Sequence, residues 1–301
     1  MRNNFFTMLT GFLMAFADSV PGVSGGTIAY ILGKYDELIN SINVLMSKAT
    51  ILEKKKSVIF LIKLAIGWIV GFVIAVFIIT NLMHEHTYEM TSLFLGFIVF
   101  SIPFIILEEQ QILKNKHLDK GFIIVGSTIV IAISYFSSSN LSLLSSNLTL
   151  ISYIYIFIAG AIAISAMLLP GISGSTLLII FGLYSTIMNS IKTTLKFDFS
   201  NILIVLIFGL GILFGLKFTS KIISKALHSY RSKVVYLIIG LMLGSIYSLI
   251  IGPTTLVNEA TNINLGLEKL SFNSFSIIFF IVGVAIIYGL DKLKHFIQNN
   301  K

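Results

Sequence analysis

Seven long apolar stretches constrain this chain more than any other feature of its sequence. They cover roughly residues 57–80, 91–107, 121–136, 148–169, 201–216, 234–251 and 273–290. An α-helix needs about 20 apolar residues to cross the hydrocarbon core of a bilayer. Charged residues make up only 11% of the chain, against roughly 25% in a soluble domain. The sequence therefore predicts an all-α polytopic membrane protein, and excludes a soluble enzyme, a disordered chain and a free nucleic-acid binder.

The distribution of Lys and Arg predicts which loops face the cytoplasm. Segments 47–56, 108–120 and 217–233 and the C-terminal tail are basic, whereas 81–90 and 137–148 contain neither Lys nor Arg. Cytoplasmic loops of membrane proteins carry an excess of these residues. The net charge of +8 is therefore attributed to orientation rather than to a nucleic-acid partner, and both termini are predicted to be cytoplasmic.

Two segments of 22 residues match each other at an offset of 149 and are identical at eleven positions, beginning at Pro21 and Pro170. A second block matches at an offset of 144 and pairs Gly67 with Gly211. We expect these glycines, which lie in Gly-x-x-x-Gly patterns, to mark close helix contacts.

The repeat divides the chain into residues 1–140 and 141–301 of a single membrane domain. Each half contains one re-entrant or broken helical hairpin, with its tip near 21–27 or 170–176, followed by three spans. Because three is odd, the second half is predicted to be inverted relative to the first. Inverted repeats whose broken helices meet near the bilayer midplane are typical of transporters.

Each hairpin tip carries the motif Pro-Gly-x-Ser-Gly, which suits an anion. Proline interrupts a helix, glycine permits the turn, and serine is a good N-cap for the arm that follows. The small residues of the next turn should leave free N–H groups at the positive end of that arm, open to a ligand. The predicted binding residues are Pro21, Gly22, Ser24, Gly25, Gly26, Thr27, Pro170, Gly171, Ser173, Gly174, Ser175 and Thr176.

Three charged residues are candidates for coupling or for neutralising the ligand. Asp18 lies inside an apolar run, three residues before Pro21, and an intramembrane acid suggests proton or cation coupling. A structural hydrogen bond to the neighbouring loop is the alternative. Lys34 and Lys63 could face the anion, although lysines at such positions commonly extend to the membrane interface instead.

Other chemistries have weaker support. Gly22-x-Ser24-x-Gly26 resembles the nucleophile motif of intramembrane serine proteases, but that chemistry needs a base, and all five histidines fall in loops or the tail. His84-Glu85-His86 could bind a metal, yet a solvated loop is favoured because HExxH spacing is absent. The chain has no cysteine, which excludes thiolate metal sites, and neither motif is a Walker A sequence. We therefore predict no metal and no cofactor.

The paired motifs PGVSGG and PGISGS resemble the bacterial polyprenyl-phosphate transporter family, the undecaprenyl-phosphate translocases formerly catalogued only as a domain of unknown function. The resemblance covers essentially the whole chain and extends to Ala-Asp18-x-x-Pro-Gly, to the segment ending Ser101-Ile-Pro103 and to Gly-Leu-Met-x-Gly-Ser245. In the second motif Ser175 replaces the glycine found at Gly26.

The resemblance implies a non-enzymatic flippase in the cytoplasmic membrane of a bacterium, which recycles undecaprenyl phosphate for cell-wall synthesis. The phosphate would pass between the two hairpin tips while the polyprenyl tail stays in lipid, as the two halves alternate in access. Its partners would be the lipid and the bilayer; the oligomeric state is not predicted. The main rival is a permease or channel for a soluble anion such as inorganic phosphate, and a third hypothesis is a structural partner of a cell-wall enzyme.

Overall fold

The computed structural model describes residues 2–18, 24–114, 116–137, 149–172, 174, 177–178, 181–251 and 268–299. Throughout these residues the regular secondary structure is helical, which confirms the all-α prediction. Six of the described helices are long and apolar enough to cross a bilayer. The α-helices are α1 (Arg2–Asp18), α2 (Gly25–Ile31), α3 (Tyr35–Leu45), α4 (Ile51–Glu85), α5 (Thr87–Glu108), α6 (Gln110–Leu113), α7 (Gly121–Ser137), α8 (Leu150–Met167), α10 (Tyr184–Leu195), α11 (Ile202–Ser229), α12 (Arg231–Ile251) and α13 (Ile277–Asn299), with a 3₁₀ turn η1 (His117–Lys120).

Glycines bring the longest helices into close contact. Helix α1 packs along α4 and α8 packs along α11. A Cβ added at Gly67 of α4 would overlap the carbonyl oxygen of Met8 in α1, and one added at Gly211 of α11 would overlap that of Phe157 in α8. Both glycines thus allow backbone to approach backbone, as small residues do in membrane helix interfaces. The predicted close contacts are confirmed.

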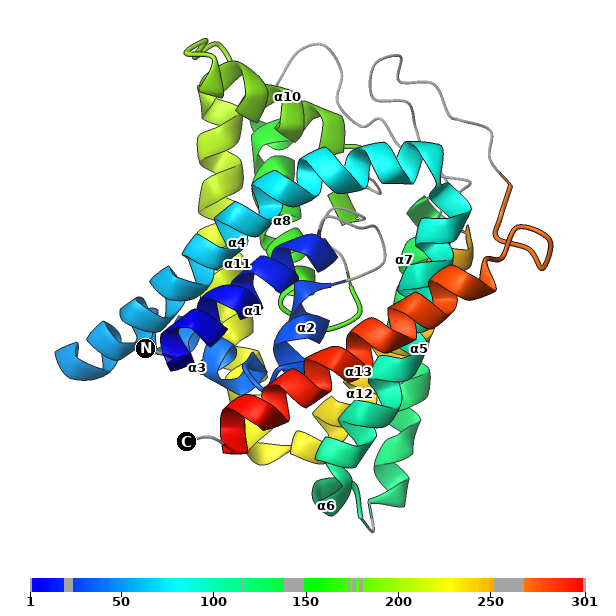
Figure 1. Ribbon diagram of the computed structural model, residues 1–301. Helices are drawn as coiled ribbons and strands as arrows, with labels where there is room; N and C mark the ends of the chain where they lie inside the picture. Colours follow the sequence, from blue (N-terminus) through cyan, green and yellow to red (C-terminus); the bar gives the residue numbers. More distant parts are fainter. Residues whose placement is uncertain are drawn as a thin grey trace.

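A second pair of helix contacts completes the bundle. Helix α13 crosses α5, and α12 packs against α7 (Figure 1). Gly96 of α5 and Gly240 of α12 leave no room for a Cβ against the partner backbone. The hydroxyl of Ser127 in α7 also donates to the Gly240 carbonyl at 3.0 Å. These contacts hold the outer helices around the short central ones.

Helix α2 lies at the centre and is wholly buried, from Gly25 to Ile31. It ends at Ile31, two residues before Gly33, whose φ of 65° is left-handed, and the Lys34 N–H donates to the Ala29 carbonyl at 2.7 Å. This is a Schellman-type helix end, which glycine forms without steric cost. Gly182, at the matching position 149 residues later, has a φ of 64°.

The segments predicted to be cytoplasmic lie at one end of the molecule. Helices α3 and α6 and the last turns of α13 occupy the lower end in Figure 1, and α10 occupies the upper end. Arg231 forms an ion pair with Asp36, and Lys294 forms one with Glu108 at 2.5 Å. Segments 108–120 and 217–233 and the end of α13 therefore lie together, as the predicted topology requires; which compartment that end meets stays a prediction.

The outer faces of the long helices are apolar. Helix α4 exposes Ile66, Ile69 and Val73, and α11 exposes Leu206 and Leu213. Exposed apolar surface of this extent is costly in water and suits contact with lipid.

Candidate anion site at two helix breaks

The first break separates α1, which ends at Asp18, from α2, which begins at Gly25. Ser24 caps α2: its hydroxyl accepts from the Gly26 N–H at 3.1 Å, and its carbonyl accepts from the Thr27 N–H at 2.9 Å. The predicted N-cap role of Ser24 is confirmed. Pro21 and Gly22 lie outside the described residues.

The second break follows α8, which ends at Met167. Pro170 and Gly171 form a buried turn in which Gly171 has a φ of 90°, a conformation that disfavours any side chain. The hydroxyl of Ser245 in α12 can donate to the Gly171 carbonyl at 3.0 Å and to the Leu241 carbonyl of its own helix at 2.9 Å, so its one proton is shared between this turn and α12. Gly174 is also buried, whereas Ser173, Ser175 and Thr176 lie outside the described residues.

The two breaks lie in contact in the protein interior. The Ser24 hydroxyl donates to the Leu169 carbonyl at 3.3 Å, although 145 residues separate them. A Cβ at Gly26 would lie 3.3 Å from the backbone nitrogen of Pro170. The Tyr35 hydroxyl, at the start of α3, donates to the Leu168 carbonyl at 3.0 Å. The fold therefore brings the two sequence motifs together at one point.

Asp18 bridges the first break. One carboxylate oxygen accepts from the Gly25 N–H at 2.7 Å, and the other accepts from the Trp68 indole N–H at 3.0 Å. The expectation that the first turn of α2 leaves its N–H groups free is wrong for Gly25 and Gly26, because Asp18 and Ser24 already occupy them. Of the two interpretations of Asp18, the hydrogen bond to the neighbouring segment is the one observed.

The two lysine candidates have partners elsewhere. Lys34 is only 9% exposed; its ammonium group forms an ion pair with Glu37 at 2.6 Å and lies 5.7 Å from the centre of the Phe60 ring. The Lys63 ammonium group donates to the Asn4 side chain at 2.9 Å. These partners belong to neither motif, so the structure does not bring the lysines together with the two breaks.

Metal and nucleophilic chemistry find little support in the same region. The described residues contain no group of three His, Asp or Glu side chains that could hold a metal ion. His86 instead lies 3.6 Å from Glu89 in the turn between α4 and α5. The hydrogen bonds found for the Ser24 hydroxyl join it to Gly26 and Leu169 rather than to a histidine.

Three residues of the site were missed from the sequence. Tyr35 and Ser245 carried a signal, because each recurs in the repeat, as Tyr184 and Ser101. Trp68 carried none, since an aromatic residue within an apolar span is equally compatible with packing. Its role depends on a contact with Asp18, 50 residues earlier in the chain.

The fold and the paired breaks define a multi-pass membrane protein with broken helices at its centre. Residues 14–267 match a family described as VCA0040-like, undecaprenyl phosphate translocase-like. A relative from Vibrio cholerae, named polyprenyl-phosphate transporter, is 34% identical over 253 residues, covering 81% of this chain and 77% of its own length. A relative of the same name from Staphylococcus aureus is 36% identical over 257 residues, covering 83% and 88%. No solved structure matches.

The chain belongs to this undecaprenyl phosphate translocase-like family. The resemblance noted from the paired motifs is thereby confirmed.

Proposed function

We propose that the protein translocates a polyprenyl phosphate, undecaprenyl phosphate, across the cytoplasmic membrane of a bacterium. The observation that carries the proposal is the contact between Ser24 and Leu169, which joins the two motif segments inside a chain of this family. The named function of the two relatives supplies the substrate class. The protein acts as a transporter rather than as an enzyme, and both termini lie in the cytoplasm.

The phosphate passes through the region of the two breaks while the polyprenyl tail stays in lipid. The twelve motif residues form the binding region. The amino end of α2 holds the Asp18 carboxylate through the Gly25 N–H, which supports an environment that accommodates negative charge at this point. Because that carboxylate occupies the helix end, binding of a phosphate there requires release of Asp18, or further polar groups and water.

Two inverted repeats, residues 1–140 and 141–301, alternate to expose the binding region to each side. The helix contacts support a repeat relation between the two halves, because α1 with α4 corresponds to α8 with α11, and α5 with α13 corresponds to α12 with α7. The last two pairs join one half to the other. The left-handed glycines Gly33 and Gly182 end the central arms at matching positions. Rocking of one repeat against the other is the usual motion of such transporters.

Asp18 controls the first break in this proposal. Its two hydrogen bonds tie α2 to α4 through Trp68, so loss or protonation of the carboxylate would release the hairpin from that helix. Proton coupling at Asp18 is tested by measuring transport with and without a proton gradient, in the native protein and in Asp18→Asn. A gradient dependence that persists in Asp18→Asn assigns coupling to another residue.

Paired glycine substitutions test the binding region. In the Gly25→Leu/Gly174→Leu variant, the new side chains would meet Asp18 and the Ala163 carbonyl, and we expect transport of a short-chain polyprenyl phosphate in liposomes to be lost. The matched control is Gly209→Leu/Gly289→Leu, at two positions where a Cβ meets nothing within 4 Å.

The same pair of variants distinguishes a lipid transporter from a structural partner of a cell-wall enzyme and from a soluble-anion permease. A structural partner of a cell-wall enzyme would tolerate the Gly25 and Gly174 changes, provided that the variant still folds. A soluble-anion permease would lose inorganic phosphate uptake in that variant and would never have moved the lipid. Transport of the lipid unaffected by the substitutions would contradict the proposed binding region.

A further inference from the structure

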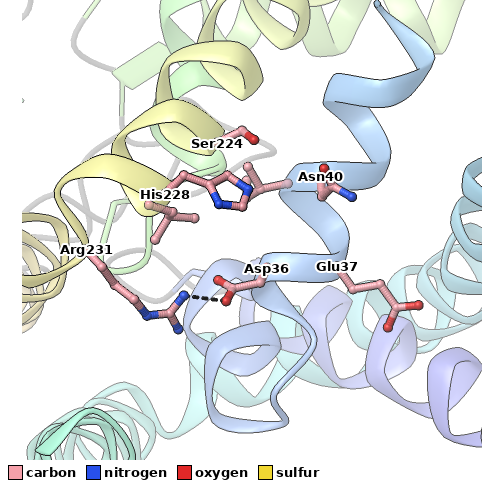
Figure 2. Close-up of a pocket in the computed structure, with 8 residues that line it drawn as sticks. Asp36, Glu37, Asn40, Ser224, His228 and Arg231 are labelled. Carbon is pink, nitrogen blue, oxygen red and sulfur yellow. Dashed lines mark hydrogen bonds and ion pairs between the residues drawn. The ribbon is translucent and has the colours of Figure 1, made fainter. Parts of the chain in front are cut away.

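Arg231, the first residue of α12, joins elements from both halves of the chain. Its guanidinium group donates to both carboxylate oxygens of Glu109, at 2.9 and 2.5 Å. A third N–H donates to the Asp36 carboxylate of α3 at 2.6 Å (Figure 2). Bidentate pairs between arginine and carboxylate are the strongest and most directional ion pairs in proteins. Arg231 therefore fixes α3 and the end of α5 against the second half.

Glu109 connects this ion pair to the centre of the molecule. It is only 3% exposed, and it accepts a hydrogen bond from the Tyr30 hydroxyl at 2.9 Å. Tyr30 belongs to α2, the helix that begins at the first break. A chain of hydrogen bonds thus runs from Arg231 through Glu109 to Tyr30 in the helix that carries the first motif.

The arrangement has no equivalent in the other half of the sequence. At the offset of 149, Asp36 corresponds to Ser185; at the offset of 144, Arg231 corresponds to Thr87 and Glu109 to Pro253. None of these three can form an ion pair. The two ends of the molecule are otherwise related by the repeat, so this charged contact distinguishes one end from the other.

A cavity that is open to solvent lies beside the ion pairs, between α3 and α11. Its volume is about 330 Å³, and Asn40, Ser224 and His228 line it together with the buried side chains of Ile39 and Leu227 (Figure 2). Asp36 and Arg231 also line the cavity, and their ion pair links α3 to α12. The ion pairs of Arg231 therefore add to the apolar contacts that hold α3 in place.

We propose that Arg231, Glu109, Asp36 and Tyr30 form a one-sided clasp, which closes the α3 end of the molecule and opens whenever the binding region is exposed to that end. This inference rests on the proposed function, since it assigns the clasp to one step of alternating access. Arg231 acts as a positioning residue: its hydrogen bonds among the described residues go to Glu109 and Asp36, and it controls α2 through Glu109 and Tyr30.

Cysteine accessibility tests the clasp, because the chain has no native cysteine. Ser224→Cys places a thiol at a buried position of α11 that lines the cavity. In this background, we expect Arg231→Gln to raise the rate of modification by a membrane-impermeant maleimide, applied from the α3 end, by at least about ten-fold. Lys217→Gln, which removes an exposed positive charge about two turns before Ser224 on α11, is the matched control.

A second variant tests whether the effect of Arg231→Gln comes from misfolding. Arg231→Gln alone leaves the Glu109 carboxylate buried without its partner, which is destabilising. The double variant Arg231→Gln/Glu109→Gln removes both charges and keeps an acceptor for Tyr30. A comparable rise in modification rate in the folded double variant supports the clasp. Rates within about two-fold of the control in a folded variant would overturn it.

Binding of a short-chain polyprenyl phosphate is measured in the same samples. If the Ser224→Cys protein binds the lipid but the Arg231 variants and the control are modified at the same rate, the clasp is wrong and the proposed function stands. If the Arg231 variants are modified faster than the control but neither the Ser224→Cys protein nor the native protein binds the lipid, the clasp stands as a conformational device and the proposed substrate is wrong.

Discussion

Asn in place of Asp18 changes the first break with little change in shape. The carboxylate now accepts two hydrogen bonds, from the Gly25 N–H and from the Trp68 indole. An amide has one oxygen acceptor, and its NH₂ group can only donate. Asp18→Asn can therefore keep one of the two hydrogen bonds, without the charge, and must turn an N–H toward the other donor.

The free-energy cost of Asp18→Asn follows from these two hydrogen bonds. A hydrogen bond to a charged group contributes about 1.5–3 kcal/mol, and a neutral one about 0.5–1.5 kcal/mol. Losing one charged bond and weakening the other by about 1–1.5 kcal/mol costs about 2.5–4.5 kcal/mol, a shift of roughly 70- to 2,000-fold in the equilibrium between the tied and released hairpin. We expect lipid transport to change by a comparable factor if release of the hairpin limits the rate.

Tryptophan fluorescence provides the assay, because Trp68 is the only tryptophan in the chain. We expect Asp18→Asn to shift the emission of Trp68, since the indole N–H loses a charged acceptor. Asp198→Asn is the control: it removes an acid that accepts from the Ser200 N–H in the loop before α11, far along the chain from the break. Emission and transport unchanged in folded Asp18→Asn would refute the assigned role of this carboxylate.

Three further substitutions test the packing around the site. Gly211→Ala, whose Cβ would overlap the Phe157 carbonyl, should lower the free energy of unfolding by about 1–3 kcal/mol, whereas Gly209→Ala, where a Cβ meets nothing within 4 Å, should change it by less than about 0.5 kcal/mol; thermal unfolding in detergent compares the two. Ser245→Ala removes the hydrogen bond to the Gly171 carbonyl and should cost about 1 kcal/mol, read as a modest loss of transport with normal folding. Gly171→Ala forces a side chain into a left-handed φ of 90° and should cost about 1–3 kcal/mol in unfolding experiments; a stability equal to that of the native protein would contradict the described turn.

Features set by local chemistry were predictable from the sequence. The apolar stretches gave the long helices, since spanning length and composition determine them. Ser24 was recognisable as an N-cap because serine is a favoured residue at that position and stands directly before the small residues Gly25 and Gly26 that begin the helix. The internal repeat predicted that the two helix breaks meet, and the structure places them in contact.

Features set by long-range contacts were not predictable. Asp18 presented two interpretations; the structure shows its hydrogen bonds to Gly25 and Trp68, and proton coupling at this residue stays a prediction. That contact also removed the free N–H groups expected at α2, because a side chain of the protein took the place assigned to a ligand. Arg231 counted in the sequence as one more basic residue of a cytoplasmic loop, and its partner Glu109 is 122 residues away.

Movement of a lipid phosphate between leaflets tests the central claim most directly. Purified protein is reconstituted in liposomes whose outer leaflet contains a short-chain polyprenyl phosphate, and loss of the head group from that leaflet is followed over time. The account predicts transfer well above that of protein-free liposomes, and none for inorganic phosphate supplied alone. Equal lipid transfer with and without the protein, or uptake of inorganic phosphate in its place, would contradict it.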